Sequence, residues 1–203
     1  MSLKVLGITG GVGSGKSTVL EYLRSTYGAY LIECDEVARK LQEPGETCYE
    51  PMIRLFGEGI LLPDQTIDRK AAAAVVFRDP SMREKLNAVV HPAVKERVRE
   101  LTARSSEYPL TVIEAALLLD DDYDEVCDEI WYVYADEDVR RRRLKAGRGY
   151  PDDRITAMFR SQRSDESFRS LTSCTIDNSS DDTAVTWRQI DRALKARGIE
   201  KAF

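Results

Sequence analysis

Near the N-terminus, glycines, a lysine and a hydroxyl group follow one another at a spacing that suits phosphate binding. The pattern G-x-x-x-x-G-K-[ST] is met by Gly10, Gly15, Lys16 and Ser17, and an apolar run at residues 5–8 precedes it directly. Glycines let backbone amides turn toward a common centre, and the helix that begins near Lys16 adds its positive end there. We predict that Lys16 neutralises the β and γ phosphates of a nucleotide and that the Ser17 hydroxyl binds magnesium.

The segments on either side of this loop support a binding role. A glycine-rich turn that contains a lysine by chance is the alternative, but it does not explain the strand pattern of residues 4–9 or the helical pattern of residues 16–26. In that helix, apolar residues recur at Val19, Leu20 and Leu23, as expected for one buried face. A strand, a glycine turn and a helix are the context that the phosphate-binding pattern requires.

Two carboxylates are expected to lie close to this loop. Asp35 follows a strand predicted for residues 29–33, and Glu114 closes a strand predicted for residues 110–114. Ligands of parallel α/β sheets gather at the carboxyl ends of the strands, where such groups can accept a proton or contact a metal or water. The residues alone leave two alternatives open, with Asp35 as a helix N-cap and Glu114 as the partner of an arginine.

The arginines and the single histidine are interpreted separately. The run from Arg140 to Arg143 lies on a predicted helix, and a run of like charges is typical of a solvent-exposed face. Arg148 lies between two glycines in an interruption between helices, where a mobile segment could bring its guanidinium over phosphates. For His91, which precedes Pro92, a packing or hydrogen-bonding role is favoured.

Strand and helix patterns alternate along the chain. Further strands are predicted for residues 129–134 and 174–178, and helices for residues 136–144, 152–163 and 182–197. Strand signals almost vanish between residues 47 and 104, and Asp68, Asp79 and Asp136 are expected to cap helices. Five strands with helical connections predict one domain, residues 1–203, built on a doubly wound parallel sheet. It carries a helical insertion at about 44–105 and a flexible lid at about 146–152.

Composition limits the classes of function. The 203 residues are 42% hydrophobic and 32% charged, and their net charge of −5 argues against general nucleic-acid binding. No apolar run approaches the ~20 residues of a membrane span, and a strand begins at once, which predicts a cytoplasmic protein without a signal peptide. The four cysteines lack C-x-x-C spacing, so reduced thiols are expected rather than a zinc site or disulfides.

Several segments together resemble the dephospho-CoA kinase family, which uses ATP to phosphorylate the ribose 3′-hydroxyl of dephospho-coenzyme A. Residues 7–18 are very similar to the opening of that family. The more specific matches are residues 33–39 with Asp35 and an Ala–Arg pair, Asp68-Arg69 before Val76-Phe77, His91-Pro92, Gln162, and Asn178 in an Ile-x-Asn element. Glu33 stands where the family has an aspartate, and Ala116 stands where it has a proline.

The resemblance implies a role for each matching residue. Asp35 would act as the base for the acceptor hydroxyl, Lys16 would act on the phosphates, and Arg148 would close over them from the lid. The acceptor would be bound by Arg69, His91, Glu114 and Asp35. The ATP-binding set would be Gly11, Val12, Gly13, Ser14, Gly15, Lys16, Ser17, Thr18 and Asn178, the last at the adenine.

The implied fold is that of a P-loop kinase, in which related enzymes order their strands 2-3-1-4-5. The implied reaction is the last step of coenzyme A biosynthesis, with Mg²⁺, ATP and dephospho-CoA as partners and neither nucleic acid nor membrane. Another small-molecule kinase, such as a nucleoside monophosphate kinase, and a non-catalytic nucleotide-binding regulator are the alternatives. A GTPase is disfavoured because the chain has no Asn-Lys-x-Asp segment.

Overall fold

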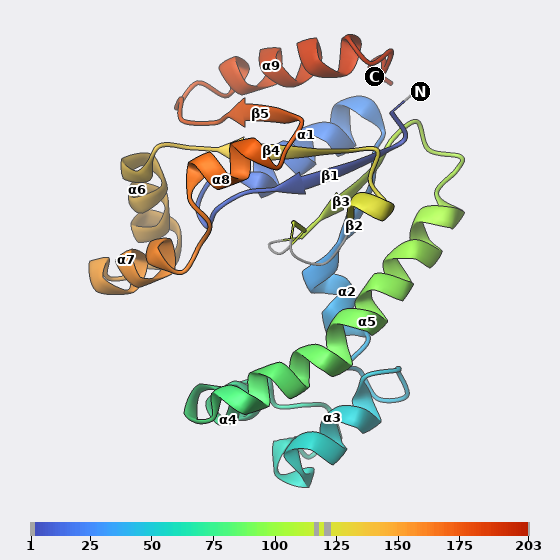
Figure 1. Ribbon diagram of the computed structural model, residues 1–203, viewed down its shortest axis with the longest axis vertical. Coiled ribbons are helices and arrows are strands. Elements are labelled where there is room, and N and C mark those ends of the chain that lie inside the picture. The colour runs from blue at the N-terminus through green and yellow to red at the C-terminus, as the bar shows by residue number, and fades with distance from the viewer. Residues whose placement is uncertain (1–2, 116–117, 120–122, 203) are drawn as a thin grey trace. The chain divides into compact units, whose positions relative to one another are not determined.

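The computed structural model describes residues 3–115, 118–119 and 123–202, which form two compact units. The first unit, which we call the sheet unit, comprises residues 1–32 and 104–203. The second, the helical unit, comprises residues 33–103. Figure 1 shows the strands and helices of both units with the labels used below.

The sheet unit is built on five strands in the order β2-β3-β1-β4-β5. Their bounds are β1 (Val5–Thr9), β2 (Tyr30–Glu33), β3 (Thr111–Glu114), β4 (Glu129–Tyr134) and β5 (Cys174–Asp177). β1 pairs in parallel with β3 and with β4, so that Ile8 lies opposite both Glu114 and Trp131. The predicted parallel α/β sheet and its strand order are therefore confirmed.

The strands hold this order because their side chains are apolar on both faces of the sheet. On one face, Leu6 and Ile8 are fully buried together with apolar residues of the helices α1 (Lys16–Tyr27) and α9 (Thr183–Lys195). On the other face, Phe168 of α8 (Asp165–Ser170) stacks on Tyr132, with ring centres 4.6 Å apart. The central strand β1 is thus fixed in place, and the loop at its carboxyl end is fixed with it.

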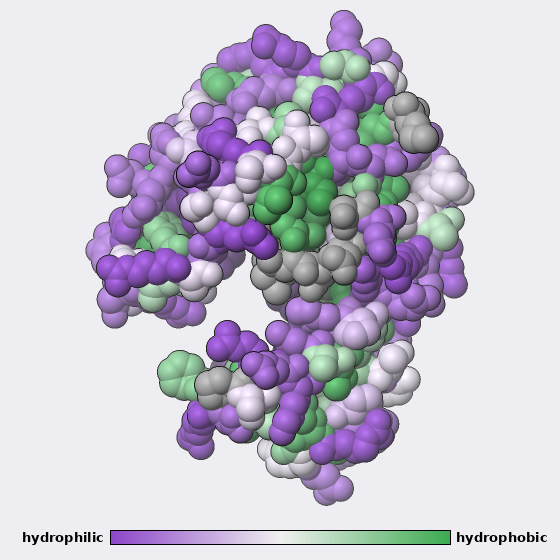
Figure 2. Space-filling view, in the orientation of Figure 1, coloured by the Kyte–Doolittle hydropathy of each residue, from purple (hydrophilic) through white to green (hydrophobic). Residues whose placement is uncertain are grey.

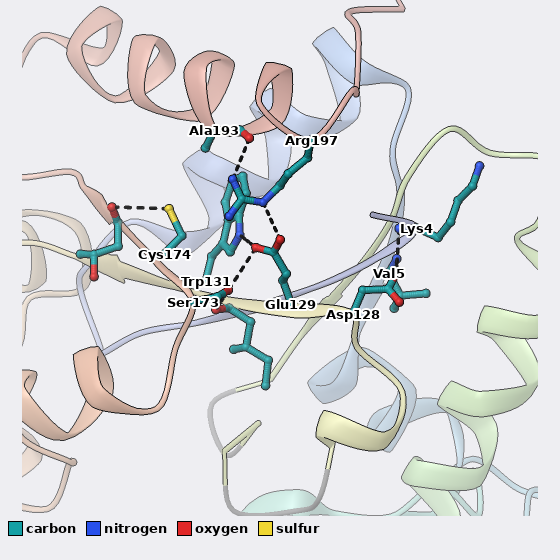
Figure 3. A network of polar contacts seen from close by, with 11 residues as sticks. Lys4, Val5, Asp128, Glu129, Trp131, Ser173, Cys174, Ala193 and Arg197 are labelled. Carbon is teal, nitrogen blue, oxygen red and sulfur yellow. Dashed lines mark hydrogen bonds and ion pairs between the residues drawn. The ribbon is translucent and has the colours of Figure 1, made fainter. Parts of the chain in front are cut away.

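The segment that follows α9 is bonded to the start of β4 by a polar network (Figure 3). Arg197 donates to the Glu129 carboxylate (2.6 Å) and lies over the ring of Trp131, and it also donates to the Ala193 carbonyl. Glu129 accepts two further hydrogen bonds, from Trp131 and Ser173. These bonds lower the pKa of Glu129, with the Arg197 hydrogen bond as the largest cause and burial as an opposing one.

The helical unit has its own small apolar core. Its helices are α2 (Cys34–Lys40), α3 (Tyr49–Phe56), α4 (Arg69–Arg78) and nearly all of α5 (Pro80–Arg104), with a 3₁₀ turn at Glu58–Ile60. The core consists of Tyr49, Met52, Ile60, Ile67 and Ala72. Asp68 caps α4 as predicted, because its carboxylate accepts from the amides of Lys70 and Ala71.

Helix boundaries after β4 differ from the prediction. α6 (Glu137–Arg148) continues through Arg148 and ends at Gly149, which adopts the left-handed conformation (φ 62°). Asp136 stands at the N-cap of α6, but its carboxylate accepts from Tyr134 instead of capping the helix. Helix α7 (Asp152–Arg160) ends before residue 163, and α8 was not predicted, since six residues are too few to show a clear period.

The described surface carries few large apolar side chains. The face seen in Figure 2 is mostly hydrophilic, and Phe77 and Leu171 are the most exposed large apolar residues among those described. No helix in the described ranges is long and apolar enough to cross a membrane. All four cysteines are free thiols, and three of them, Cys34, Cys48 and Cys127, are buried.

Candidate active site

The phosphate-binding loop, residues Gly10 to Ser17, connects β1 to α1 as the sequence predicts. Gly13 (φ 79°) and Gly15 (φ 91°) adopt the left-handed conformation, which residues with a Cβ rarely take. Gly15 is also the N-cap of α1 and offers no side chain to cap it. The first turn of α1 therefore presents its amides and its positive dipole end to an anion.

Lys16 and Glu114 meet at the carboxyl ends of neighbouring strands. The Lys16 Nζ atom lies 3.5 Å from Glu114 Oε1 and donates a 2.9 Å hydrogen bond to the Gly10 carbonyl. Both side chains are largely enclosed, with 18% and 14% of their surfaces exposed. This ion pair joins Glu114 to a lysine. One cation is thus held at the loop within reach of a phosphate. The pairing of Glu114 with an arginine and its role in binding the acceptor stay predictions.

The side of the loop away from β3 is held by residues from two distant segments. The Ser14 carbonyl accepts from Asn178 Nδ2 (2.8 Å) and from Arg143 Nη1 (3.3 Å). Asn178 follows β5 and is itself fixed by Thr186 of α9, whose hydroxyl donates to its Oδ1 atom (2.9 Å). A Cβ at Gly15 would lie 2.2 Å from Asn178 Nδ2, so this contact requires a glycine.

The arginine run on α6 is not the solvent-exposed face that we expected. Arg140 is buried, and it and Arg143 hydrogen-bond to loop carbonyls, those of Val12 and Ser14. Arg141 and Arg142 instead pair with acidic side chains: Arg141 with Glu137 and Asp152, and Arg142 with Asp181. The spacing of three residues places Arg140 and Arg143 on one face of the helix, toward the loop.

Sequence reasoning missed Arg140, Arg143 and Thr186 as site residues. Their sequence signal is weak. Arg140 and Arg143 bond to a loop more than 120 residues away, and Thr186 acts on it through Asn178. β4 lies directly beside β1, and Figure 1 shows α6 beyond the carboxyl end of β4. The i, i+3 spacing within the run, combined with the strand order 2-3-1-4-5, could have identified the two arginines.

Arg148 lies at the C-terminus of α6 with an exposed side chain. Its guanidinium carbon is 5.9 Å from the centre of the Tyr150 ring, and Arg154 lies over the same ring at 3.8 Å. Three residues, 149–151, separate α6 from α7. The lid and the role of Arg148 at the phosphates stay predictions.

The remaining predicted residues belong to the helical unit. Asp35 is the second residue of α2 and is exposed, and the N-cap position belongs to Glu33, which makes no capping hydrogen bond. The alternative that Asp35 serves as the helix cap is therefore wrong. Its negative charge in the first turn is still favourable for the helix. Its role as a base stays a prediction, and the departure at Ala116 lies outside the described residues.

Arg69 opens α4 and donates from Nη2 to the Arg39 carbonyl (3.2 Å). It lines a surface pocket of about 590 Å³ within the helical unit, together with Gln42, Glu43, Leu62, Thr66, Ile67, Asp68 and Lys70. His91 is half-buried within α5 and stands one residue before Pro92. The acceptor-binding roles of Arg69 and His91 stay predictions.

Comparison with known proteins shows one family over most of the chain. The family model described as "Dephospho-CoA kinase" matches residues 4–183. A dephospho-CoA kinase of Geobacter sulfurreducens is 41% identical over 149 residues, which cover 72% of this chain and 75% of the relative. One of Thermobifida fusca is 34% identical over 201 residues, which cover 96% and 100% of the two chains.

A solved Thermus thermophilus protein shares the fold over nearly the whole length. It is 31% identical, covers 97% of this chain and 98% of its own, and superposes with a TM-score of 0.82. The same family is supported by the phosphate-binding loop, by the strand order and by the length of the sequence match. This chain belongs to the dephospho-CoA kinase family.

Proposed function

We propose that the phosphate-binding loop and Asp35 together transfer the γ-phosphoryl group of ATP to the 3′-hydroxyl of dephospho-CoA. The family assignment supplies the reaction, which is the ATP-dependent phosphorylation of dephospho-CoA in the last step of coenzyme A biosynthesis. The observation that supports the assignment of residues is the loop itself, which holds the Lys16 ammonium between Glu114 and the Gly10 carbonyl. ATP and dephospho-CoA are thus the partners of the chain.

Lys16 acts on the phosphates by changing partners. Its ammonium is attached through a flexible stem, and moving from the Gly10 carbonyl toward the β and γ phosphates exchanges a neutral acceptor for charged ones. The positive charge then offsets the negative charge that the transferred group carries. Glu114 keeps the ammonium at the loop between turnovers.

The donors at the loop fit a magnesium ion. Mg²⁺ prefers oxygen ligands and is commonly held by few protein groups together with substrate phosphates. Ser17 has an exposed side chain in the first turn of α1, and among the described residues no cluster of three or more His, Cys, Asp or Glu side chains could hold a metal. The Ser17 hydroxyl would hold the ion together with the phosphates. When bound, Mg²⁺ neutralises phosphate charge.

Asp35 accepts the proton of the acceptor hydroxyl. As the proton moves to the Asp35 carboxylate, the ribose oxygen forms a bond to the γ-phosphorus, and the bond from that phosphorus to the bridging oxygen breaks. ADP leaves with the bridging oxygen. Arg148 supports the transfer from the lid by adding donors at the phosphoryl oxygens, and Arg69 and His91 bind the acceptor. Asn178 completes the ATP site near the adenine.

We place the enzyme in the cytoplasm, where free thiols such as its four cysteines remain reduced. Its net charge of −5 gives no general affinity for nucleic acid. Both statements agree with small-molecule substrates.

The test is acceptor-dependent formation of ADP with MgATP. Dephospho-CoA, AMP, CMP and dTMP are compared with a reaction that lacks an acceptor, and mass spectrometry detects a product heavier by one phosphate. We expect turnover with dephospho-CoA alone and no turnover after chelation of Mg²⁺. Turnover only with a nucleoside monophosphate would overturn the proposal, as would ATP binding without any acceptor-dependent turnover.

A further inference from the structure

Arg140, Gln162 and the backbone of Val12 form a closed ring of hydrogen bonds. Arg140 Nε donates to the Val12 carbonyl (2.9 Å), and Arg140 Nη2 donates to Gln162 Oε1 (2.7 Å). The same Oε1 atom accepts from the Val12 amide (3.2 Å). One side chain near the start of α6 and one that follows α7 therefore hold both polar groups of a single loop residue.

This ring fixes the orientation of two peptide groups. The described chain contains no cis peptide bond, and in a trans peptide the carbonyl and the next amide point in opposite directions. Because the Val12 carbonyl accepts from Arg140, the amide of Gly13 points away from Arg140. The Val12 amide is itself engaged by Gln162. We call this ring of Arg140, Gln162 and Val12 the brace. It leaves the Gly13 amide available to a phosphate, whereas the Val12 amide is already bonded to Gln162.

The space around Gly11 supports this arrangement independently. A Cβ at Gly11 would lie 2.6 Å from Arg140 Nη2 and 2.9 Å from Gln162 Oε1, both closer than real Cβ contacts. Position 11 is one of the unspecified positions of the phosphate-binding pattern, so the pattern does not require a glycine there. The requirement comes from the two side chains of the ring.

The charge of Arg140 is also placed at the loop. The residue is 9% exposed, and its guanidinium carbon lies 4.3 Å from the centre of the Phe159 ring. In the part of the chain that the structure describes, its hydrogen-bond acceptors are the Val12 carbonyl and the Gln162 amide oxygen, which are neutral. Surroundings of low dielectric screen such a charge less than water does, so it adds positive potential at the phosphates.

We propose that Arg140 and Gln162 are positioning residues that set the Val12 and Gly13 peptides of the phosphate-binding loop for ATP. They act through the backbone and not by touching the substrate. The inference rests on the use of ATP by the family. It deepens the function of the loop by tying its geometry to α6 and to the segment after α7. Arg140 and Gln162, which come before and after the predicted lid at about 146–152, are thereby both bonded to one loop residue.

Variants of the two residues test the brace. Arg140→Met keeps the apolar stem and removes the donors, Gln162→Leu removes the acceptor, and a double variant combines them. Arg140→Lys keeps the charge but lacks the planar fork that reaches two acceptors. Arg142→Met is the matched control, because Arg142 lies on the same helix and pairs at the surface with Asp181. Calorimetry measures binding of MgATP without an acceptor, and melting temperature reports folding.

We expect Arg140→Met, Arg140→Lys and Gln162→Leu each to raise the Kd for MgATP about five- to twentyfold, while the control stays within about twofold. The double variant is expected to bind like the weaker single variant, because either change opens the same ring. In steady-state assays KM for ATP should rise more than kcat falls, and KM for dephospho-CoA should stay unchanged. This split separates a positioning role from a general loss of structure.

Wild-type MgATP affinity in Gln162→Leu would overturn the brace. Wild-type affinity in Arg140→Lys would overturn it too, because it would show that only the charge of Arg140 matters. Simple additivity in the double variant would overturn it as well. If Arg140→Met does not fold, these two variants decide the question. Because MgATP binding is measured without an acceptor, failure of the brace would not affect the assignment of dephospho-CoA as substrate. Likewise, a different acceptor would not affect the brace.

Discussion

The ammonium group of Lys16 lies 3.5 Å from the carboxylate of Glu114, which joins the first turn of α1 to the end of β3. This ion pair places the cation at the carboxyl edge of the sheet, where ligands of such folds bind. It also sets a negative charge beside the positive charge of Lys16. Substitution of either residue should therefore change the affinity for the nucleotide.

Lys16→Ala is expected to weaken MgATP binding and turnover together. The charge is used in the ground state and in the transition state, so its loss should raise KM for ATP and lower kcat by about 10²-fold or more. Calorimetry with MgATP and an ADP-release assay measure the two effects. Lys4→Ala, an exposed change at the other end of β1, serves as the control. A variant that lost only acceptor binding would contradict the role of Lys16.

Asp35→Asn is expected to lower kcat by about 10²–10⁴, or roughly 3–5 kcal/mol of barrier, because the amide cannot accept the hydroxyl proton. The affinity for ATP should change little. Glu36→Gln is the matched control, since Glu36 is the next residue of α2 and pairs with Arg39 at the surface. If Asp35→Asn turned over at a near-normal rate, Asp35 would have no part in proton transfer.

Thr186→Val is expected to weaken the support that Asn178 gives to the phosphate-binding loop. Thr186 is fully buried, and its hydroxyl donates to Asn178 Oδ1 (2.9 Å), which in turn holds the Ser14 carbonyl. Leaving that buried acceptor unpaired should cost about 1–3 kcal/mol and lower Tm by about 2–4 °C per kcal/mol. The Kd for MgATP should rise about three- to tenfold, which calorimetry would detect.

Thr183→Val is the control for this prediction, because Thr183 is the exposed first residue of α9. It should leave both Tm and the MgATP affinity nearly unchanged. A Thr186→Val protein with lower Tm but wild-type MgATP affinity would show that Thr186 stabilises the fold without setting the loop.

Arg197→Met is expected to destabilise the sheet unit in a manner that depends on pH. The pKa of Glu129 is lowered from its ordinary 4.5, chiefly by the hydrogen bond from Arg197. A lowered folded-state pKa contributes stability above the unfolded value and loses it as pH falls through the folded value. At pH 7 the variant should lose about 1–3 kcal/mol, and the difference from wild type should shrink below pH 4.5.

Thermal unfolding of the two proteins across this pH range measures the effect. Lys195→Met, an exposed change near the end of α9, should show no comparable dependence on pH. A loss of stability in Arg197→Met that stayed constant down to pH 3 would mean that packing over Trp131, and not the bond to Glu129, gives the effect of Arg197.

The fold and the centre of the site could be predicted because their signals are local. The glycines of the loop, the apolar strands and the Asp68 cap each act within a few residues of their own position. The bracing of the loop could not be predicted in the same way. Arg140 lies 128 residues from its acceptor Val12, and its neighbours in the sequence made it look like part of a solvated charged run. Only the pairing of β1 with β4 brings the two together.

The attachment of α9 has a consequence for synthesis of the chain. The loop is complete in sequence by residue 17, yet its Ser14 carbonyl is held by Asn178, and Asn178 is held by Thr186. Because a ribosome releases the N-terminal part first, a growing chain exposes the loop long before its supports exist. We expect nascent chains to acquire firm nucleotide affinity only when nearly all residues have emerged. ATP would then stabilise finished molecules and not partly made ones.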